Sequence, residues 1–261
     1  MKKIINIVPY NPKWPDIFKI YSYELKKALN ENCIAIYHVG STSVPGLCAK
    51  PIIDIMCVVK DLKKATRTLE ELGYTGKGEF NLPLRLYFSK KQPHVVHLHV
   101  VNENSGEINW NLDFQNYLRE NKDARDAYAN TKLSLIKENP DGFNKAVGWF
   151  SDYTTKKGEI ILEIAKKAGF KDYRFVIISN YNEIQSYKKL MQINKIHFNE
   201  NISHLCLYKG TEIVAAACVK FNQKNFTAII QTIKGTNIKY ENIIKEKIKE
   251  WVTFHDFKLT V

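Results

Sequence analysis

The first 170 residues carry hydrophobic patterns of two different periods, which predict helices and strands in alternation. Apolar residues recur every third or fourth position over 14–30, and Pro15 and Asp16 are typical of a first helical turn. Residues 52–59 are almost continuously apolar and β-branched, which is typical of a strand buried on both faces. The same patterns predict strands over 4–8, 34–39, 82–89 and 95–101, a helix over 61–72, two helices within 111–137 that break at 121–123, and a helix over 144–167. Together these elements predict one α+β domain over residues 1–170.

The pattern restarts after residue 171 and predicts a second, smaller α/β domain over 171–261. Its expected elements are strands over 175–179, 204–208, 213–221, 227–233 and 258–261, and helices over 183–195 and 240–251. The aromatic residues of the first domain's helices are interpreted as core rather than as a base-stacking surface: Trp110, Trp149, Phe150 and Tyr153.

Composition narrows the class of protein but not its activity. Of 261 residues, 44% are hydrophobic and 25% charged, which is typical of a globular protein. The longest apolar runs, 51–59 and 213–219, are far shorter than the ~20 residues that cross a bilayer, so no membrane partner is expected. The five cysteines include no Cys-x-x-Cys pair and favour a reducing cytoplasm.

The net charge of +12 favours anionic partners such as nucleotides, coenzyme A or RNA. A lysine-rich genome explains the charge equally well. Nucleic acid therefore stays open as a partner, although no aromatic-basic motif supports it.

A turn rich in glycine and hydroxyl groups follows the expected strand 34–39. It reads Gly40-Ser41-Thr42-Ser43, and such a turn lets backbone N–H groups and a hydroxyl approach a phosphate. Asp54 then stands in the otherwise apolar strand 52–59. Because burying a lone carboxylate is costly, we expect a metal, a cation or several hydrogen-bond donors beside it.

The string from His38 to Ile55, together with 97–100 and 114–119, closely resembles the GrpB-like family, a group of the nucleotidyltransferase superfamily. The resemblance covers about residues 5–168 and implies a nucleotidyltransferase-like mixed sheet with helices. In that superfamily a Gly-Ser turn after a strand holds the nucleoside triphosphate, and acidic residues on neighbouring strands hold magnesium. The resemblance therefore implies phosphate contacts at Gly40, Ser41 and Thr42, and a metal-binding carboxylate at Asp54.

The sequence departs from the superfamily's metal site. Met56 stands where a second carboxylate is expected, and a thioether is a poor ligand for a hard ion. The neighbouring strand instead offers His97 and His99, on one face. Asp54 with two imidazoles would suit zinc, manganese or iron better than magnesium. Alternatively, the two histidines hydrogen-bond a phosphate directly or have a structural role.

Two basic residues are further candidates. Arg85 lies mid-strand and either clamps a phosphate or faces solvent. Lys50 either neutralises phosphate charge beside a catalytic Asp54, or is an ordinary loop lysine. A purely structural interpretation pairs Asp54 with Lys50 or Arg85.

The order strand, helix, three strands, helix, strand after residue 172 is similar to the first part of the GNAT acetyltransferase fold. In that fold a glycine-rich loop that opens a helix binds coenzyme A pyrophosphate. The corresponding segment begins with Lys234 and Gly235, and it keeps one glycine and no arginine. The resemblance implies a partial GNAT-like domain with a degenerate acetyl-coenzyme A loop. It also implies an open sheet edge after 258–261, which a second copy would cover in a homodimer.

The preferred hypothesis is therefore a nucleotidyltransferase-fold protein that binds a nucleotide phosphate and a divalent metal, and transfers a nucleotidyl group to an unknown acceptor. The alternative is a non-catalytic module that binds a phosphorylated metabolite, with a second domain that binds coenzyme A or mediates dimerisation. Acetyltransferase activity is the third hypothesis.

Overall fold

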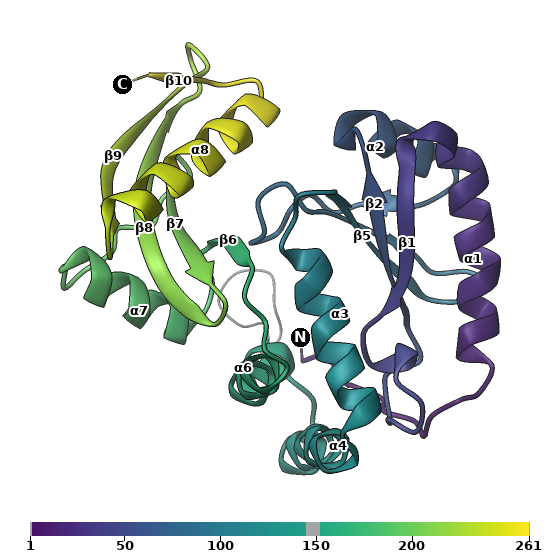
Figure 1. Cartoon of the computed structure of the whole chain (residues 1–261). Coiled ribbons are helices and arrows are strands. Elements are labelled where there is room, and N and C mark those ends of the chain that lie inside the picture. The colour runs from purple at the N-terminus through teal and green to yellow at the C-terminus, as the bar shows by residue number, and fades with distance from the viewer. Residues whose placement is uncertain (1, 145–151, 261) are drawn as a thin grey trace. The chain divides into compact units, whose positions relative to one another are not determined.

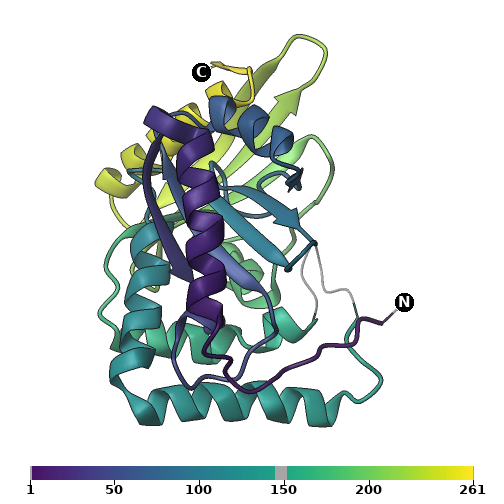
Figure 2. The same ribbon diagram turned by 90° about the vertical axis from the view of Figure 1, so that its right-hand side faces the viewer.

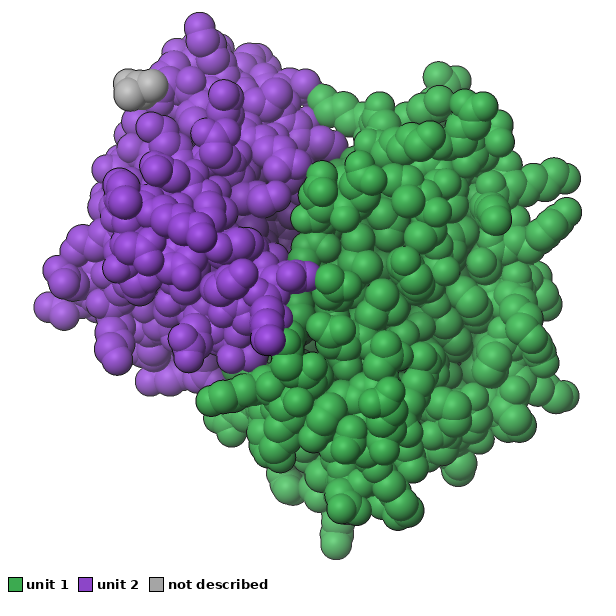
Figure 3. Space-filling view, in the orientation of Figure 1, with its two compact units in different colours: residues 1–80, 85–170 green, residues 81–84, 171–261 purple. Residues whose placement is uncertain are grey.

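The computed structural model describes residues 2–144 and 152–260. The chain divides into two compact units, which Figure 3 shows in different colours: residues 1–80 with 85–170, and residues 81–84 with 171–261. Each unit contains one five-stranded sheet with both parallel and antiparallel neighbours. The chain is therefore mixed α+β with two mixed sheets (Figure 1).

Unit 1 forms a sheet of order β1-β2-β5-β4-β3, in which β2 and β5 are parallel and the other neighbours antiparallel. Its strands are β1 (Cys33–Val39), β2 (Ile53–Val59), β3 (Thr75–Gly76), β4 (Leu86–Lys90) and β5 (Val96–Asn102). Its described helices are α1 (Trp14–Leu29), α2 (Leu62–Glu71), α3 (Glu107–Glu120), α4 (Lys122–Glu138), α5 (Asp152–Lys156) and α6 (Gly158–Lys167), with short 3₁₀ turns at Asn30–Asn32 and Ser41–Ser43.

The two faces of this sheet are covered by different helices: α1 and α2 lie on one face and α3 on the other (Figures 1 and 2). On the α3 face, Met56 and Val58 of β2 pack with Val101 of β5, and Ile108 and Leu112 of α3 cover them. Side chains alternate along a strand, so the Asp54 side chain belongs to this same face. The face that α3 covers is thus apolar along most of β2 and polar where the strand begins.

A second core packs the remaining helices against the loop that follows the 3₁₀ turn. Val44 and Leu47 of this loop contact Leu118 of α3, Tyr128 of α4 and Ile164 of α6. All five side chains are buried, with at most 4% of their surface exposed. This apolar contact holds α4 beside the loop, and it thereby sets which α4 side chains can reach Ser41.

Unit 2 forms a sheet of order β10-β9-β8-β7-β6, in which only the β9–β10 pair is parallel. Its elements are β6 (Tyr173–Ile177), α7 (Tyr181–Met191), β7 (Ile202–Lys209), β8 (Glu212–Asn222), β9 (Thr227–Gly235), α8 (Ile238–Phe254) and β10 (Lys258–Thr260). The backbone carbonyl of Asn81 accepts a hydrogen bond from Ile177 N at 2.8 Å, so residues 81–84 extend this unit. The order of elements is the one that the sequence predicts.

Three sequence-based predictions of elements were wrong in part. Residues 4–8 form no strand; single backbone bridges join Lys3 to Phe143 and Val8 to Ala49, and Pro9 cannot donate to a continued ladder. The strand expected over 82–89 begins only at Leu86.

The reason for this late start is a pair of left-handed residues. Phe80 and Leu84 have φ angles of 54° and 62°, so the chain turns at both and 81–84 leave the first sheet. In the third case, the described part of the helix expected over 144–167 is two helices, α5 and α6.

The interpretation of the helix aromatics as core residues is confirmed for Tyr153, which is 1% exposed. Trp110 is half-buried and packs edge-on against Phe170, with the ring centroids 5.1 Å apart. Trp149 and Phe150 lie outside the described residues. No helix in the described ranges combines the length and the apolar character needed to cross a membrane.

Candidate functional site

The turn after β1 is built around the close approach of Gly40 to Asp54. Gly40 has φ +70°, and a Cβ on it would stand 2.6 Å from Asp54 Oδ2, so only glycine fits without displacing the carboxylate. This contact follows from the sheet register, because Val39 of β1 pairs directly with Asp54 of β2. The glycine and the acid singled out in the sequence therefore touch one another.

Two residues of α3 hold the turn from outside. The Ser43 hydroxyl lies 2.7 Å from the Gly40 carbonyl and 2.8 Å from Gln115 Oε1. The Arg119 guanidinium donates to the Ser43 carbonyl from Nη2 at 2.9 Å and from Nε at 3.2 Å. Gln115 and Arg119 belong to the segment 114–119 that carries the family resemblance, and their positioning role was not predicted from the sequence.

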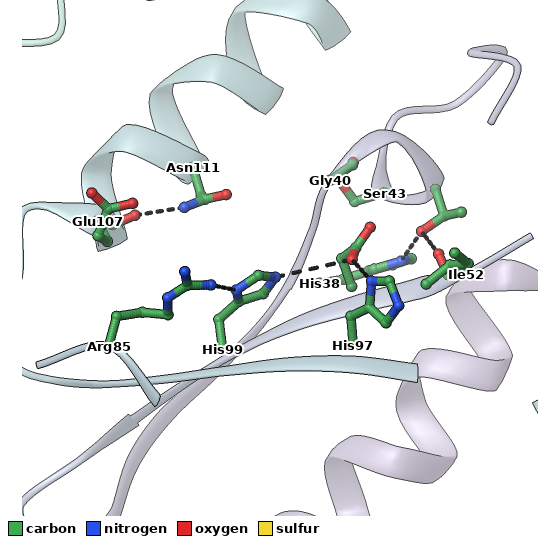
Figure 4. A network of polar contacts seen from close by, with 11 residues as sticks. His38, Gly40, Ser43, Ile52, Arg85, His97, His99, Glu107 and Asn111 are labelled. Atoms are coloured by element: carbon green, nitrogen blue, oxygen red, sulfur yellow. Dashed lines mark hydrogen bonds and ion pairs between the residues drawn. The ribbon is translucent and has the colours of Figure 1, made fainter. Parts of the chain in front are cut away.

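Asp54 is contacted by two histidines, and Figure 4 shows these histidines, His97 and His99, in a row with Arg85. His97 is the partner of Asp54 on the parallel strand β5, and His97 Nδ1 is 3.3 Å from Asp54 Oδ1. His99 Nε2 lies 4.0 Å from the same oxygen. Burial alone would raise the pKa of Asp54, but the hydrogen bond from His97 and the nearby charges, including Lys50, lower it below its ordinary value. Asp54 is therefore an ionised carboxylate at neutral pH.

Arg85 fixes the tautomer of His99. Arg85 Nη1 is 2.9 Å from His99 Nδ1, and a guanidinium can only donate, so Nδ1 accepts and the neutral ring carries its proton on Nε2. Burial and the Arg85 charge lower the pKa of His99 to about 3, against the opposing charge of Asp54. Arg85 is 6% exposed and its Nη2 donates to the Glu79 carbonyl at 3.2 Å, so it is not a solvent-facing residue.

The Thr42 hydroxyl makes two hydrogen bonds within the protein. Its Oγ1 donates to the Ile52 carbonyl at 3.0 Å, so the His38 Nε2 atom 3.1 Å away must be the donor to Oγ1. The His38 ring stacks on Phe18 with centroids 4.8 Å apart, and burial lowers the pKa of His38 to about 4. Thr42 therefore shapes the turn, while its hydroxyl proton is already committed.

Three lysines from separate parts of unit 1 converge on the turn. Lys132 of α4 is 2% exposed, and its Nζ donates to Ser41 Oγ at 3.3 Å and to the Cys48 carbonyl. Lys50 precedes β2, and Lys157 lies between α5 and α6. Burial lowers the pKa of each of the three side chains from 10.5 to about 8. They remain mainly protonated at pH 7.

Two buried tyrosines lie under these ammonium groups. Lys132 Nζ is 4.7 Å from the Tyr128 ring centroid, and Lys157 Nζ and Lys50 Nζ are 4.5 and 5.0 Å from that of Tyr153. The aromatic faces stabilise cations that burial would otherwise disfavour. Lys132, Lys157, Tyr128 and Tyr153 were not predicted as site residues, because helical periodicity does not reveal which helix faces the turn.

These groups enclose a cavity of about 200 Å³ within unit 1. Its lining includes six residues singled out in the sequence: Gly40, Ser41, Thr42, Lys50, Asp54 and His97. It also includes Tyr128, Lys132, Tyr153 and Lys157. Arg85 and His99 are not among the lining residues. His99 lies next to Asp54, and Arg85 contacts His99. The structure thus brings most of the predicted residues to one hollow.

The donor set around Asp54 does not fit a divalent metal. Met56 is 1% exposed and packs in the core, so no second carboxylate stands at that position. His99 Nε2 carries a proton and has no lone pair to offer as a ligand. Within residues 2–144 and 152–260, no three His, Cys, Asp or Glu side chains gather as a metal ion would need. The lysine-rich lining fits an anion instead.

In unit 2, the groups of the loop that would bind coenzyme A already have hydrogen-bond partners within the chain. Gly235 N donates to Glu241 Oε1 at 3.0 Å, and the Asn237 side chain caps α8 by accepting from Tyr240 N at 3.2 Å. Lys234 Nζ donates to Gln192 Oε1 at 2.8 Å. A pyrophosphate at this helix start would need these same donors, and it would meet the Glu241 carboxylate. The loop as folded does not fit coenzyme A.

A family profile described as "GrpB protein" matches residues 4–167, which is most of unit 1. The chain belongs to the GrpB family. In a solved structure, the conserved protein GrpB from Enterococcus faecalis, the match covers 62% of this chain and 96% of that one, at 36% identity and a TM-score of 0.55.

Curated relatives match the same region. The chain is 35% identical to UPF0157 protein BH1888 of Halalkalibacterium halodurans over 169 residues, which is 63% of this chain and 82% of that protein. It is also 35% identical to UPF0157 protein YqkA of Bacillus subtilis over 152 residues, 56% of this chain. The match spans only 44% of the length of YqkA. GrpB membership thus rests on residues 4–167, and residues 171–261 of unit 2 lie outside the range that the profile matches.

Proposed function

We propose that the unit 1 cavity of this GrpB protein binds the phosphate group of a nucleotide or another phosphorylated small molecule. The convergence of Lys50, Lys132 and Lys157 on the Gly40–Thr42 turn carries this proposal. Asp54 is the one carboxylate among the described residues that line the cavity, so the lining is positively charged. Dianionic phosphate accepts several charge-assisted hydrogen bonds and matches such a lining.

The size of the cavity favours a small bound group. Pockets that enclose a whole drug-sized ligand measure roughly 300–1,000 Å³. A cavity of about 200 Å³ instead suits a phosphate or pyrophosphate group, with the rest of the molecule extending outward. This supports binding through the phosphate, and it leaves the identity of the attached group to experiment.

Isothermal titration calorimetry of the full chain with pyrophosphate and with nucleoside triphosphates tests the proposal. Lys132→Met removes a buried ammonium group and should weaken binding at least about tenfold, which corresponds to a lost charge-assisted hydrogen bond. Lys137→Met is the matched control, because Lys137 is an exposed lysine of the same helix. Equal binding by the wild type and Lys132→Met, or no binding of any of these anions, would contradict the proposal.

Nucleotidyl transfer is the second candidate, supported by the resemblance at Gly40, Ser41 and Asp54. It differs from simple binding in needing a divalent cation, which the donor set around Asp54 does not favour. Titration of a triphosphate with and without Mg²⁺ or Mn²⁺ separates the two candidates. Binding that strengthens with the cation and is lost in Asp54→Asn would favour nucleotidyl transfer.

Two expectations about partners stay predictions. Association of two copies through unit 2 is tested by sedimentation equilibrium of the full chain. Binding of nucleic acid is tested by the salt dependence of its affinity, since each phosphate contact adds to that dependence.

A further inference from the structure

His97 and Asp54 both line the cavity, and their side chains contact one another. The His97 side chain is 29% exposed, and its Nδ1 atom is 3.3 Å from Asp54 Oδ1. An ionised carboxylate can only accept, so Nδ1 must carry the proton of this contact. The neutral ring therefore keeps its lone pair on Nε2, the ring nitrogen that does not contact Asp54.

Asp54 is itself held in place from two other directions. His99 presents its Nε2 proton toward the same Oδ1 atom from 4.0 Å, and Arg85 fixes that tautomer from behind. Gly40 lies beside the carboxylate, where a Cβ would stand 2.6 Å from Oδ2. His99 and Arg85, which do not line the cavity, thus orient Asp54, and Asp54 in turn orients His97. An imidazole oriented by a carboxylate in this way is the arrangement of a general base.

We infer that His97 Nε2 is the catalytic general base of this site, serving attack by a hydroxyl compound or water on the phosphorus of the bound phosphate group. This inference rests on the proposed phosphate binding. It adds a reaction class, metal-free phosphoryl transfer, in which Asp54, His99 and Arg85 are positioning residues.

The proposed step moves one proton and exchanges one bond at phosphorus. Nε2 takes the proton of the attacking O–H group, the oxygen forms a bond to phosphorus, and the bond from phosphorus to the leaving oxygen breaks. The electron pair of that bond stays on the leaving oxygen, which takes a proton from the imidazolium or from water. The ammonium groups of Lys50, Lys132 and Lys157 stabilise the charge that develops on the phosphoryl oxygens.

Long-range ¹H–¹⁵N correlation NMR of the histidine rings in the full chain tests the inference, with pyrophosphate as the probe. His97 is expected as the Nδ1–H tautomer and His99 as the Nε2–H tautomer. Saturation with pyrophosphate should shift the His97 Nε2 resonance and leave His204, whose ring contacts Tyr187 in unit 2, unmoved. An Nε2–H tautomer at His97 would overturn the inference.

Modification by diethyl pyrocarbonate, located by mass spectrometry, provides a second readout of His97 reactivity. The unprotonated Nε2 should react in the wild type and be protected by pyrophosphate. Asp54→Asn keeps the shape of the side chain but removes its charge, and it should slow the reaction at His97 about tenfold, as expected for a lost charge-assisted contact. The exposed His94 is the internal control, with an unchanged rate.

The two proposals fail in different ways. If calorimetry shows that pyrophosphate binds while the His97 resonance and reactivity do not respond, the general base is wrong and phosphate binding stands. If pyrophosphate does not bind, the phosphate site is wrong and the general base falls with it, even where the tautomers are as expected.

Discussion

Asp54 Oδ2 occupies the space that a side chain at residue 40 would need. The distance from this oxygen to a Cβ built on Gly40 is 2.6 Å, which is shorter than any ordinary contact. Gly40 also has φ +70° and ψ −173°, a region that other residues rarely adopt. The turn and the carboxylate are thus mutually dependent.

Gly40→Ala should consequently both destabilise unit 1 and weaken phosphate binding. The backbone strain alone costs of order 1–3 kcal/mol, and the clash with Asp54 adds to it. Urea unfolding measures the loss of stability, and calorimetry with pyrophosphate measures the loss of affinity.

Gly78→Ala is a matched control for this effect. Gly78 has φ +72°, but a Cβ there meets nothing within 4 Å. It should show the conformational cost without the change in affinity. Equal effects of the two substitutions would mean that contact with Asp54 is unimportant.

Much of the fold could be predicted from the sequence because its signals are local. The continuous β-branched run of β2, the helix start at Trp14 and the break near Asn121 each depend on neighbouring residues, and each is where the sequence places it. The segment 81–84 could not be predicted, because the Asn81 carbonyl accepts its hydrogen bond from Ile177 of β6, far along the chain. Nothing within the segment itself signals that partner.

The candidate site likewise contains residues that could be predicted from the sequence and residues that could not. Gly40, Ser41 and Asp54 lie within one short stretch, and their approach follows from the pairing of β1 with β2. Lys132 of α4 and Lys157, which directly precedes α6, are brought near the turn by the apolar packing of these helices around Leu47. A buried lysine has the same appearance in a helical pattern as an exposed one, so tertiary structure is needed to find it.

Thr42→Val should lower stability more than it lowers phosphate affinity. Valine keeps the shape but leaves the Ile52 carbonyl and the His38 Nε2–H without the bonds that Thr42 Oγ1 supplies. Unsatisfied buried polar groups cost about 1–3 kcal/mol each. Thermal unfolding and calorimetry measure the two effects.

Ser41→Ala should have the opposite balance of effects to Thr42→Val. Ser41 lines the cavity and accepts from Lys132, so its loss should mainly lower affinity. A larger loss of affinity in Thr42→Val than in Ser41→Ala would show that the Thr42 hydroxyl contacts the ligand.

Acetyl-coenzyme A should leave the melting temperature of the wild type unchanged, because Glu241 and Asn237 already use the donors at the start of α8. A ligand at a hundred times its Kd would stabilise the folded chain by about 2.7 kcal/mol, which differential scanning fluorimetry detects readily. Glu241→Gln keeps an acceptor for Gly235 N while removing the negative charge. The response of its melting temperature to acetyl-coenzyme A is compared with that of the wild type. A clear rise in the melting temperature of the wild type would restore the hypothesis that the second domain binds acetyl-coenzyme A.

Stability and phosphate binding should respond to alkaline pH in opposite directions. The pKa values of Lys50, Lys132 and Lys157 are about 8 in the folded chain, against 10.5 ordinarily. Well below pH 8 the three lysines are charged in both the folded and the unfolded state, so pH has no effect through them. Between pH 8 and about 10 the unfolded state binds more protons, so the free energy of unfolding of the ligand-free chain should rise with pH.

Pyrophosphate affinity should fall over the same range, because the ligand needs the ammonium groups that are lost. Urea unfolding and calorimetry at several pH values measure both trends in the same preparation. Lys132→Met should flatten each trend, since it removes one of the three titrating groups, whereas the exposed Lys137→Met should leave both unchanged. Stability and affinity that fall together above pH 8 would indicate that alkali unfolds the cavity rather than discharging it.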